Sequence, residues 1–125
     1  MKRKSVKIVY WILTLLFALM MFLDGLAGAF RVAGATEALA YLGYPAYLST
    51  ILGIAKIMGS AALLQPVFYA VKEWAYAGFT FIFTGAFASH FFAGSGFGFL
   101  ILPLIMLATM FLSYFLWRKF ESEEL

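Results

Sequence analysis

The sequence contains no cysteine and a single histidine, and these absences exclude several kinds of chemistry. Without cysteine, the chain's own side chains can supply no thiolate nucleophile, no disulfide exchange and no iron–sulfur ligands. His90 by itself cannot form a bis-histidine haem site within one chain. The sequence also has no His/Asp/Glu cluster with the spacing of zinc ligands, so it predicts no metal site and no evident cofactor.

Charged residues are scarce as well. They make up 12% of the chain, against about a quarter of an ordinary soluble domain, and hydrophobic residues make up 65%. This composition predicts an integral membrane protein. Four spans of about 20 residues use nearly all of the 125 residues, so no length remains for a soluble catalytic domain. The net charge of +3 does not indicate a nucleic-acid partner, because the basic residues lie at expected membrane edges.

Four apolar segments predict an all-α fold, a single four-transmembrane-helix domain over residues 1–125. The basic segment MKRKSVK resembles the start of a signal peptide, but the apolar run that follows is too long for one, so we expect a retained span. Pro66 is expected to close the second span, and GSGFG at 94–98 to separate the last two. The expected spans cover about residues 8–30, 47–65, 74–92 and 98–117.

The segment between the first two spans mixes polar and apolar residues. It predicts a short extracytoplasmic helix from Thr36 to Leu42, with Thr36 as the N-cap and Gly43 as the stop. The alternative is a re-entrant stretch that dips into the membrane. The sequence leaves both open.

Lysine and arginine counts predict the orientation, because cytoplasmic loops carry the excess of these residues. Only Arg31 falls on the opposite side. Trp11, Trp74 and Trp117 are expected at the same cytoplasmic interface, so both termini are predicted to be cytoplasmic, in the bacterial inner membrane. The basic residues on the predicted cytoplasmic side are Lys2, Arg3, Lys4, Lys7, Lys72, Arg118 and Lys119.

Three ionisable residues from three different spans fall in the outer half of the membrane. At about 1.5 Å per residue, Asp24, Lys56 and His90 all lie within roughly 13 Å of its outer surface. Because an unpaired charge at this depth is costly, Asp24 is expected to pair with Lys56, with Arg31 as the competing partner. Lys56 belongs to a polar and small-residue stripe that should face the bundle, formed by Ser49, Gly53, Lys56 and Ser60.

Two interpretations of these polar residues remain open. Asp24 and Lys56 could simply lock two helices together. They could instead line an outward-facing cavity that holds the polar end of a ligand, with His90 nearby, Arg31 at the rim and Tyr44 over the mouth. No catalytic set is recognisable, so enzymatic activity stays open and a protein without autonomous activity is favoured.

Three motifs resemble those of the DoxX-like family of small four-helix membrane proteins: LGYPAY at 42–47, KEWAYAG at 72–78 and SHFFAGSG at 89–96. Lys56 followed by Gly59, and an acidic residue late in the first span, match the family pattern too. The wider superfamily is similar to the membrane subunit of archaeal thiosulfate:quinone oxidoreductase. It also includes methylamine-utilisation membrane proteins and chaperones of receptor assembly in animals. The resemblance therefore implies either quinone-linked or chaperone-like functions.

KEWAYAG has its own physical interpretation. Lys72 ends the cytoplasmic connection, Glu73 is expected in the first turn of the third span, and Trp74 anchors at the headgroups. These three residues are also a candidate cytoplasmic contact with a partner. Ala75, Gly78, Gly85, Ala86 and Ser89 are expected to pack closely against another helix.

The functions that remain are three. The first is a protein that binds a lipophilic ligand, a quinone or lipid, as an accessory subunit of a membrane redox system. The second is a structural or chaperone-like partner of another membrane protein, with the polar cluster serving helix packing. The third is a transporter component, which would need a homo-oligomer because four short spans without an inverted repeat make a poor transporter.

Overall fold

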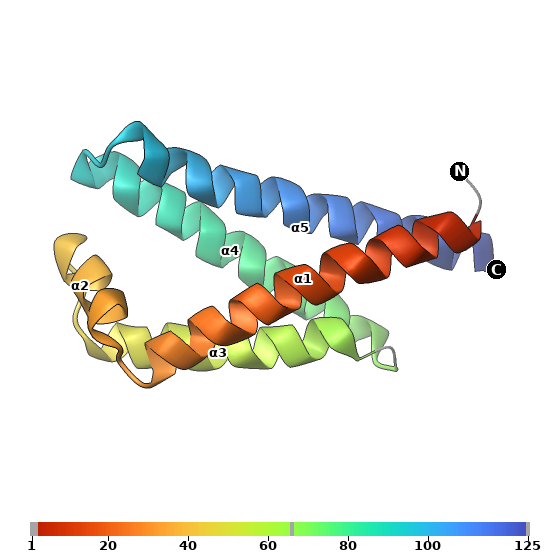
Figure 1. Cartoon of the computed structure of the whole chain (residues 1–125), viewed down its shortest axis with the longest axis horizontal. Coiled ribbons are helices and arrows are strands. Elements are labelled where there is room, and N and C mark those ends of the chain that lie inside the picture. The colour runs from red at the N-terminus through yellow and green to blue at the C-terminus, as the bar shows by residue number, and fades with distance from the viewer. Residues whose placement is uncertain (1–2, 66, 125) are drawn as a thin grey trace.

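The computed structural model describes residues 3–65 and 67–124, with side chains described for residues 4–65 and 67–119. Over these residues the secondary structure is entirely helical (Figure 1). The helices are α1 (Arg3–Ala29), α2 (Ala33–Tyr41), α3 (Tyr47–Leu64), α4 (Tyr69–Ala93) and α5 (Phe97–Glu124). Each predicted span thus corresponds to one long helix, and α2 is the short helix predicted between the first two.

By length and composition, three of these helices can cross a membrane: α1, α3 and α5. Helix α4 has 25 residues and is long enough, but Thr80, Thr84 and His90 lower its hydropathy and it does not belong to this set. The membrane-protein prediction is therefore supported by three helices, and the fourth span remains a prediction.

Several predicted boundaries were wrong. Helix α2 begins at Ala33, so Thr36 lies inside it and donates its hydroxyl hydrogen bond to the Ala33 carbonyl instead of capping. Helix α4 begins at Tyr69, which places Glu73 in the second turn and not the first. Helix α5 continues to Glu124, beyond the expected end of the last span at 117, and no glycine or proline interrupts it there. Pro66 lies outside the described residues.

Glycines let α1 and α3 cross at very short distance. A Cβ at Gly53 would lie 2.8 Å from the Gly28 carbonyl carbon, and one at Gly25 would lie 2.7 Å from the Gly53 oxygen. The Ser49 hydroxyl donates a 2.7 Å hydrogen bond to the Gly28 carbonyl across the same contact. This is the close approach that small residues permit between helices in a bilayer. The small-residue stripe predicted on the second span is confirmed at this crossing.

The end of the bundle away from this glycine crossing, where α1 begins and α5 ends, is closed by aromatic packing. We refer to it as the terminal end, and to the other as the α2 end (Figure 1). The Lys72 ammonium lies 4.6 Å from the Tyr10 ring centroid, 5.2 Å from Trp11 and 4.9 Å from Trp117. Only 3% of Lys72 is exposed, so these cation–π contacts join α1, α4 and α5 in a largely desolvated setting.

A buried hydroxyl cluster reinforces the same three helices. Thr14 Oγ1 and Ser113 Oγ are 2.7 Å apart, and the Tyr76 hydroxyl lies 2.8 Å from Ser113 Oγ. Just beyond it, Phe17 packs edge-on against Phe79 and Phe83, with ring centroids 5.3 and 5.9 Å apart. The contact of α1 with α4 and α5 in the terminal half of the bundle is therefore closely packed.

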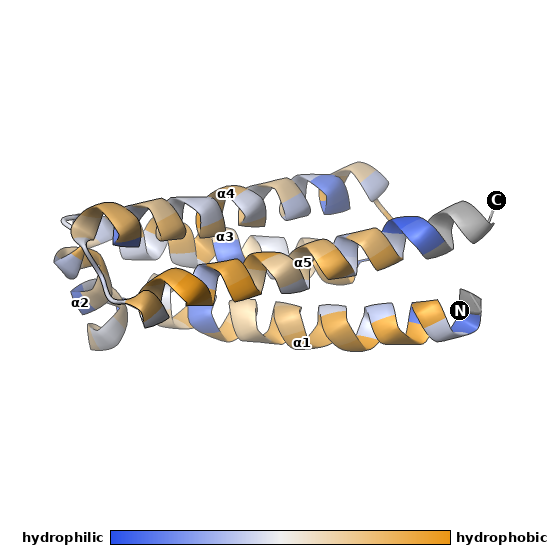
Figure 2. Cartoon of the chain, turned by 90° about the horizontal axis from the view of Figure 1, so that it is seen from above, coloured by the Kyte–Doolittle hydropathy of each residue, from blue (hydrophilic) through white to orange (hydrophobic). Residues whose placement is uncertain are grey.

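The α2 end differs, because the α1–α3 pair and the α4–α5 pair diverge toward it (Figure 1). In Figure 2, apolar colouring runs along α1 and α5, and hydrophilic colouring gathers where α1 begins and α5 approaches its end. The chain thus forms two helix pairs that are joined tightly at the terminal end and separate toward α2.

Substituting Gly53→Ala should destabilise the protein by about 1–3 kcal/mol, because the new methyl group would overlap the α1 backbone and force the helices apart. Thermal unfolding in mild detergent would measure this. Gly78→Ala is the matched control. A Cβ at Gly78 meets nothing within 4 Å, so this variant should be unchanged, or stabilised by up to about 1 kcal/mol through helix propensity. Equal stability of the two variants would contradict the close crossing.

Candidate functional site

Asp24 and Lys56 form an ion pair just beside the glycine crossing. Lys56 Nζ lies 2.5 Å from Asp24 Oδ2, joining α3 to α1. Asp24 directly precedes Gly25, and Lys56 is one turn beyond Gly53, so the short interhelical distance brings the two side chains together. The predicted pairing is confirmed. The carboxylate is 56% exposed and the lysine 19%, so the pair faces an open space and is not sealed in the α1–α3 contact.

Arg31 does not compete for Asp24. Helix α1 ends at Ala29, and Arg31 has a left-handed backbone with φ of 52°, so it no longer shares a helical face with Asp24. Its Nε donates a 2.8 Å hydrogen bond to Thr50 Oγ1 at the start of α3. Arg31 fastens the α1–α2 turn to α3 and lines neither of the two large cavities described below.

His90 lies in the last turn of α4, across the opening from the ion pair. Its Nδ1 is 2.9 Å from Ser95 Oγ, and its ring stacks on Phe99 of α5 with centroids 5.3 Å apart. Gly94, with φ of 74°, ends α4 in the left-handed conformation and turns the chain so that Ser95 and Phe99 reach the imidazole. The α4–α5 connection thus fixes the orientation of the ring.

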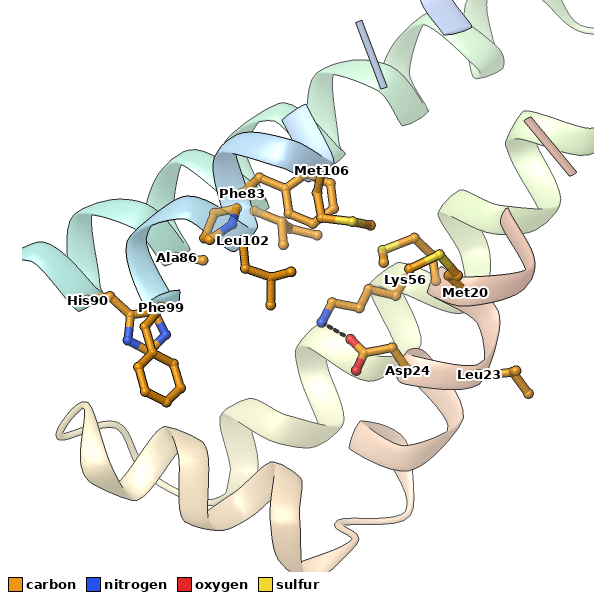
Figure 3. Close-up of a pocket in the computed structure, with 13 residues that line it drawn as sticks. Met20, Leu23, Asp24, Lys56, Phe83, Ala86, His90, Phe99, Leu102 and Met106 are labelled. Atoms are coloured by element: carbon orange, nitrogen blue, oxygen red, sulfur yellow. Dashed lines mark hydrogen bonds and ion pairs between the residues drawn. The ribbon is translucent and has the colours of Figure 1, made fainter. Parts of the chain in front are cut away.

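The ion pair and His90 face one cavity of about 500 Å³ (Figure 3). Asp24 and Lys56 form one wall, and His90, Phe99 and Leu102 form the other. This volume lies within the range of about 300–1,000 Å³ that is usual for small-molecule sites, which are mostly apolar with a few polar groups. The remaining lining residues are Met20, Met21, Leu23, Ile82, Phe83, Ala86, Pro103 and Met106.

A second cavity of about 500 Å³ lies between α3 and α4, beneath α2. Tyr44 lines it, and the Tyr44 hydroxyl lies 2.6 Å from Ser89 Oγ on α4. Lys56 and His90 line this cavity too. The structure therefore brings together four of the five predicted ligand-site residues, Asp24, Lys56, His90 and Tyr44, around two adjoining cavities, and separates Arg31 from them.

The sequence profile of the DoxX-like family matches residues 12–113. The chain belongs to the DoxX-like family. The match covers all the site residues named above and most of the four long helices. Searches of curated proteins and of solved structures gave no match.

The predicted cytoplasmic contact of this DoxX-like protein is divided between interior and surface. Lys72 is buried among the aromatic rings of the terminal end. Glu73 accepts 3.2 Å hydrogen bonds from the Tyr114 hydroxyl and from Arg118 Nη1, which link α4 to α5. Trp74 is 71% exposed. Of the three residues, Trp74 is the one whose side chain is mostly available to a partner.

The small-residue side of α4 does not pack as predicted. Gly78 and Gly85 would both accept a Cβ with nothing within 4 Å, so no helix approaches closely there. Gly85 lines the second cavity, and Gly78 lines a separate hollow of about 270 Å³ with Trp74 nearer the terminal end. In this DoxX-like protein, these glycines leave space instead of allowing a close helix contact.

Sequence reasoning missed two features. One is Gly25, which belongs to the α1–α3 crossing as much as Gly28 does. The other is the buried cluster of Thr14, Tyr76 and Ser113. Its signal was present, because Thr14 and Ser113 are isolated hydroxyls in apolar runs, and such groups need partners in a bilayer. Nothing in the sequence indicated which partners they would find.

The ion pair of this DoxX-like protein should show energetic coupling in a double-mutant cycle. We expect Asp24→Asn and Lys56→Met each to destabilise the protein. The double variant should lose less unfolding free energy than the sum of the two single losses. A coupling free energy of about 0.5–3 kcal/mol is expected for side chains in direct contact. Unfolding of all four proteins in the same detergent would measure it. Strict additivity would contradict an interacting pair.

Proposed function

We propose that this protein binds a lipophilic, membrane-resident ligand in the cavity between the α1–α3 and α4–α5 pairs. One observation carries this proposal. An ion pair and an imidazole, from three helices, face each other across a mostly apolar cavity of about 500 Å³. Ionisable groups are rare in apolar spans and commonly mark ligand or ion sites, and these project into the cavity, not into a packed interface.

The ligand's position follows from the cavity lining. Its polar end would lie between Lys56 and His90, and its apolar part against Leu23, Leu102 and Met106. A quinone fits this description, with its ring near the stacked His90 and Phe99. His90 and Asp24 could then exchange protons with a reduced quinone. Electrons would come from a partner protein, so the role would be that of an accessory subunit in a membrane redox system.

The same proposal includes four spanning helices and an orientation. Helix α4 packs against α5 and also contacts α3, from which it separates toward the α2 end (Figure 1), and this packing supports treating it as the fourth span. The basic residues Lys4, Lys7, Arg118 and Lys119 gather at the terminal end, which we therefore assign to the cytoplasm. The cavity then opens toward the outer leaflet, with α2 covering its outer face. A bacterial inner membrane fits this arrangement.

A second candidate function is a structural or chaperone-like partner of another membrane protein, or a homo-oligomer. The observation that favours it is the exposed Trp74 beside the hollow lined by Gly59 and Gly78. In that case the Asp24–Lys56 pair would serve only to hold α1 to α3. A stoichiometric protein that co-purifies with the wild type and is lost in Trp74→Ala would support this function.

Native mass spectrometry of protein purified in mild detergent, with organic extraction of the same sample, tests ligand binding. We expect the wild type to retain a quinone or a specific lipid. Asp24→Asn and Lys56→Met should lose it, because each removes one charge from the cavity wall. Glu37→Gln, an exposed carboxylate on α2 that lines neither large cavity, is the control and should retain the ligand.

Unfolding temperatures of these variants would separate lost binding from lost folding. If the wild type carries no small molecule, or if folded Lys56→Met retains as much as the wild type, the cavity is not the binding site. The polar residues would then be helix-packing elements, and the partner-protein function would be favoured.

A further inference from the structure

The two large cavities meet at the same polar centre. They share four lining residues, Lys56, Ile82, Ala86 and His90. From this centre, the first cavity extends between α1 and α5, and the second extends between α3 and α4. Each has a volume of about 500 Å³. Together they form two apolar arms that leave one polar junction in different directions.

Both arms have exposed apolar rims. On the first arm, Leu23 of α1 is 57% exposed and Leu102 of α5 is 59% exposed. On the second arm, Phe81 of α4 is 77% exposed. Leu23 and Leu102 lie on candidate membrane spans, and Phe81 lies on α4, which we take as the fourth span. The rims therefore face lipid, and a hydrocarbon chain could enter either arm sideways without crossing a polar surface.

The second arm has room because Gly85 has no side chain. A Cβ at Gly85 would meet nothing within 4 Å, and Ala86 at the junction carries only a methyl group. A glycine inside a helix usually costs stability relative to alanine, and here no close helix contact compensates for that cost. Its effect is to leave the arm open.

The chemistry of the junction selects the head group. Lys56 supplies an ammonium to both arms, whereas Asp24 lines the first arm but not the second. In the tautomer in which Ser95 donates to Nδ1, the neutral His90 ring carries its proton on Nε2 and can donate it. The Lys56 ammonium has three N–H groups and donates one to Asp24, so two remain. Together with the imidazole N–H, these donors favour a group with several acceptor oxygens, such as a phosphate.

We propose that the two cavities form a single site for an anionic phospholipid with two chains. Its phosphate binds between Lys56 and His90, and one chain occupies each arm. The inference rests on the proposed function, since it names the class of lipophilic ligand, and it differs from a quinone in requiring both arms. Asp24 positions Lys56 at the junction through the ion pair. Tyr44, tied to Ser89, closes the second arm on the α2 side.

Binding of one defined lipid and its single-chain form tests the proposal. Delipidated protein in mild detergent would be titrated with dioleoyl-phosphatidylglycerol and, separately, with its lyso form, and bound molecules counted by native mass spectrometry. We expect one tightly retained diacyl lipid per chain. The lyso form should bind at least about tenfold more weakly, because it loses the contribution of every buried methylene of one chain.

Variants that fill one arm sharpen the test. Gly85→Leu in the second arm and Leu102→Trp in the first should each lower the affinity for the diacyl lipid at least about tenfold, because one chain is no longer buried. Each variant should bind the lyso form with an affinity within about twofold of the wild type, because the other arm stays open. Gly78→Leu and Leu104→Trp are matched controls on α4 and α5, in sites that line neither arm, and should bind like the wild type.

The outcomes separate this inference from the proposed function. A small molecule that is lost in Lys56→Met but unaffected by Gly85→Leu would overturn the two-armed site and leave a one-armed ligand such as a quinone. Diacyl lipid retained equally by the wild type and folded Lys56→Met would be annular lipid and would also overturn it. A wild type that binds neither lipid nor any extracted molecule would overturn both proposals.

Discussion

The close crossing of α1 and α3 at Gly25, Gly28 and Gly53 is the contact on which the rest of the site depends. A side chain at any of these positions would overlap the backbone of the facing helix. Because the backbones touch there, Asp24 and Lys56, beside and one turn beyond the crossing, come within ion-pairing distance. Without it, each charge would stand alone in an apolar span, where an unpaired charge is costly.

The two ends of the bundle differ in how closely their helices pack. At the terminal end, rings from three helices surround Lys72, and Thr14, Tyr76 and Ser113 satisfy one another's hydroxyls, so α1, α4 and α5 converge. At the α2 end, α4 and α5 separate from α1 and α3. Glycines act differently in the two places. Gly53 removes a clash between helices, whereas Gly85 leaves a cavity unfilled.

This division explains how a small helical bundle can contain sizeable cavities. Contacts in the packed half stabilise the fold. They include aromatic pairs such as Phe17 with Phe79, and hydrogen bonds between hydroxyls that a bilayer would otherwise leave unsatisfied. The open half is then free to present Asp24, Lys56 and His90 without having to be tightly packed. This separation lets cavities form without loosening the rest of the bundle, because cavities normally cost packing contacts.

The sequence by itself determined the membrane class, the four long helices, the α2 helix and the Asp24–Lys56 pairing. Hydropathy and the cost of an isolated charge act locally, or through a single strong pair, and so can be read along the chain. Helix ends at Thr36 and Glu73 were misplaced, because several nearby residues can start a helix. Only the tertiary structure decided that Lys72 turns inward, that Arg31 binds Thr50, and that Gly78 and Gly85 face open space. The surroundings of these residues depend on which helix lies opposite and at what distance. The sequence does not distinguish a glycine that faces a helix from one that faces a cavity.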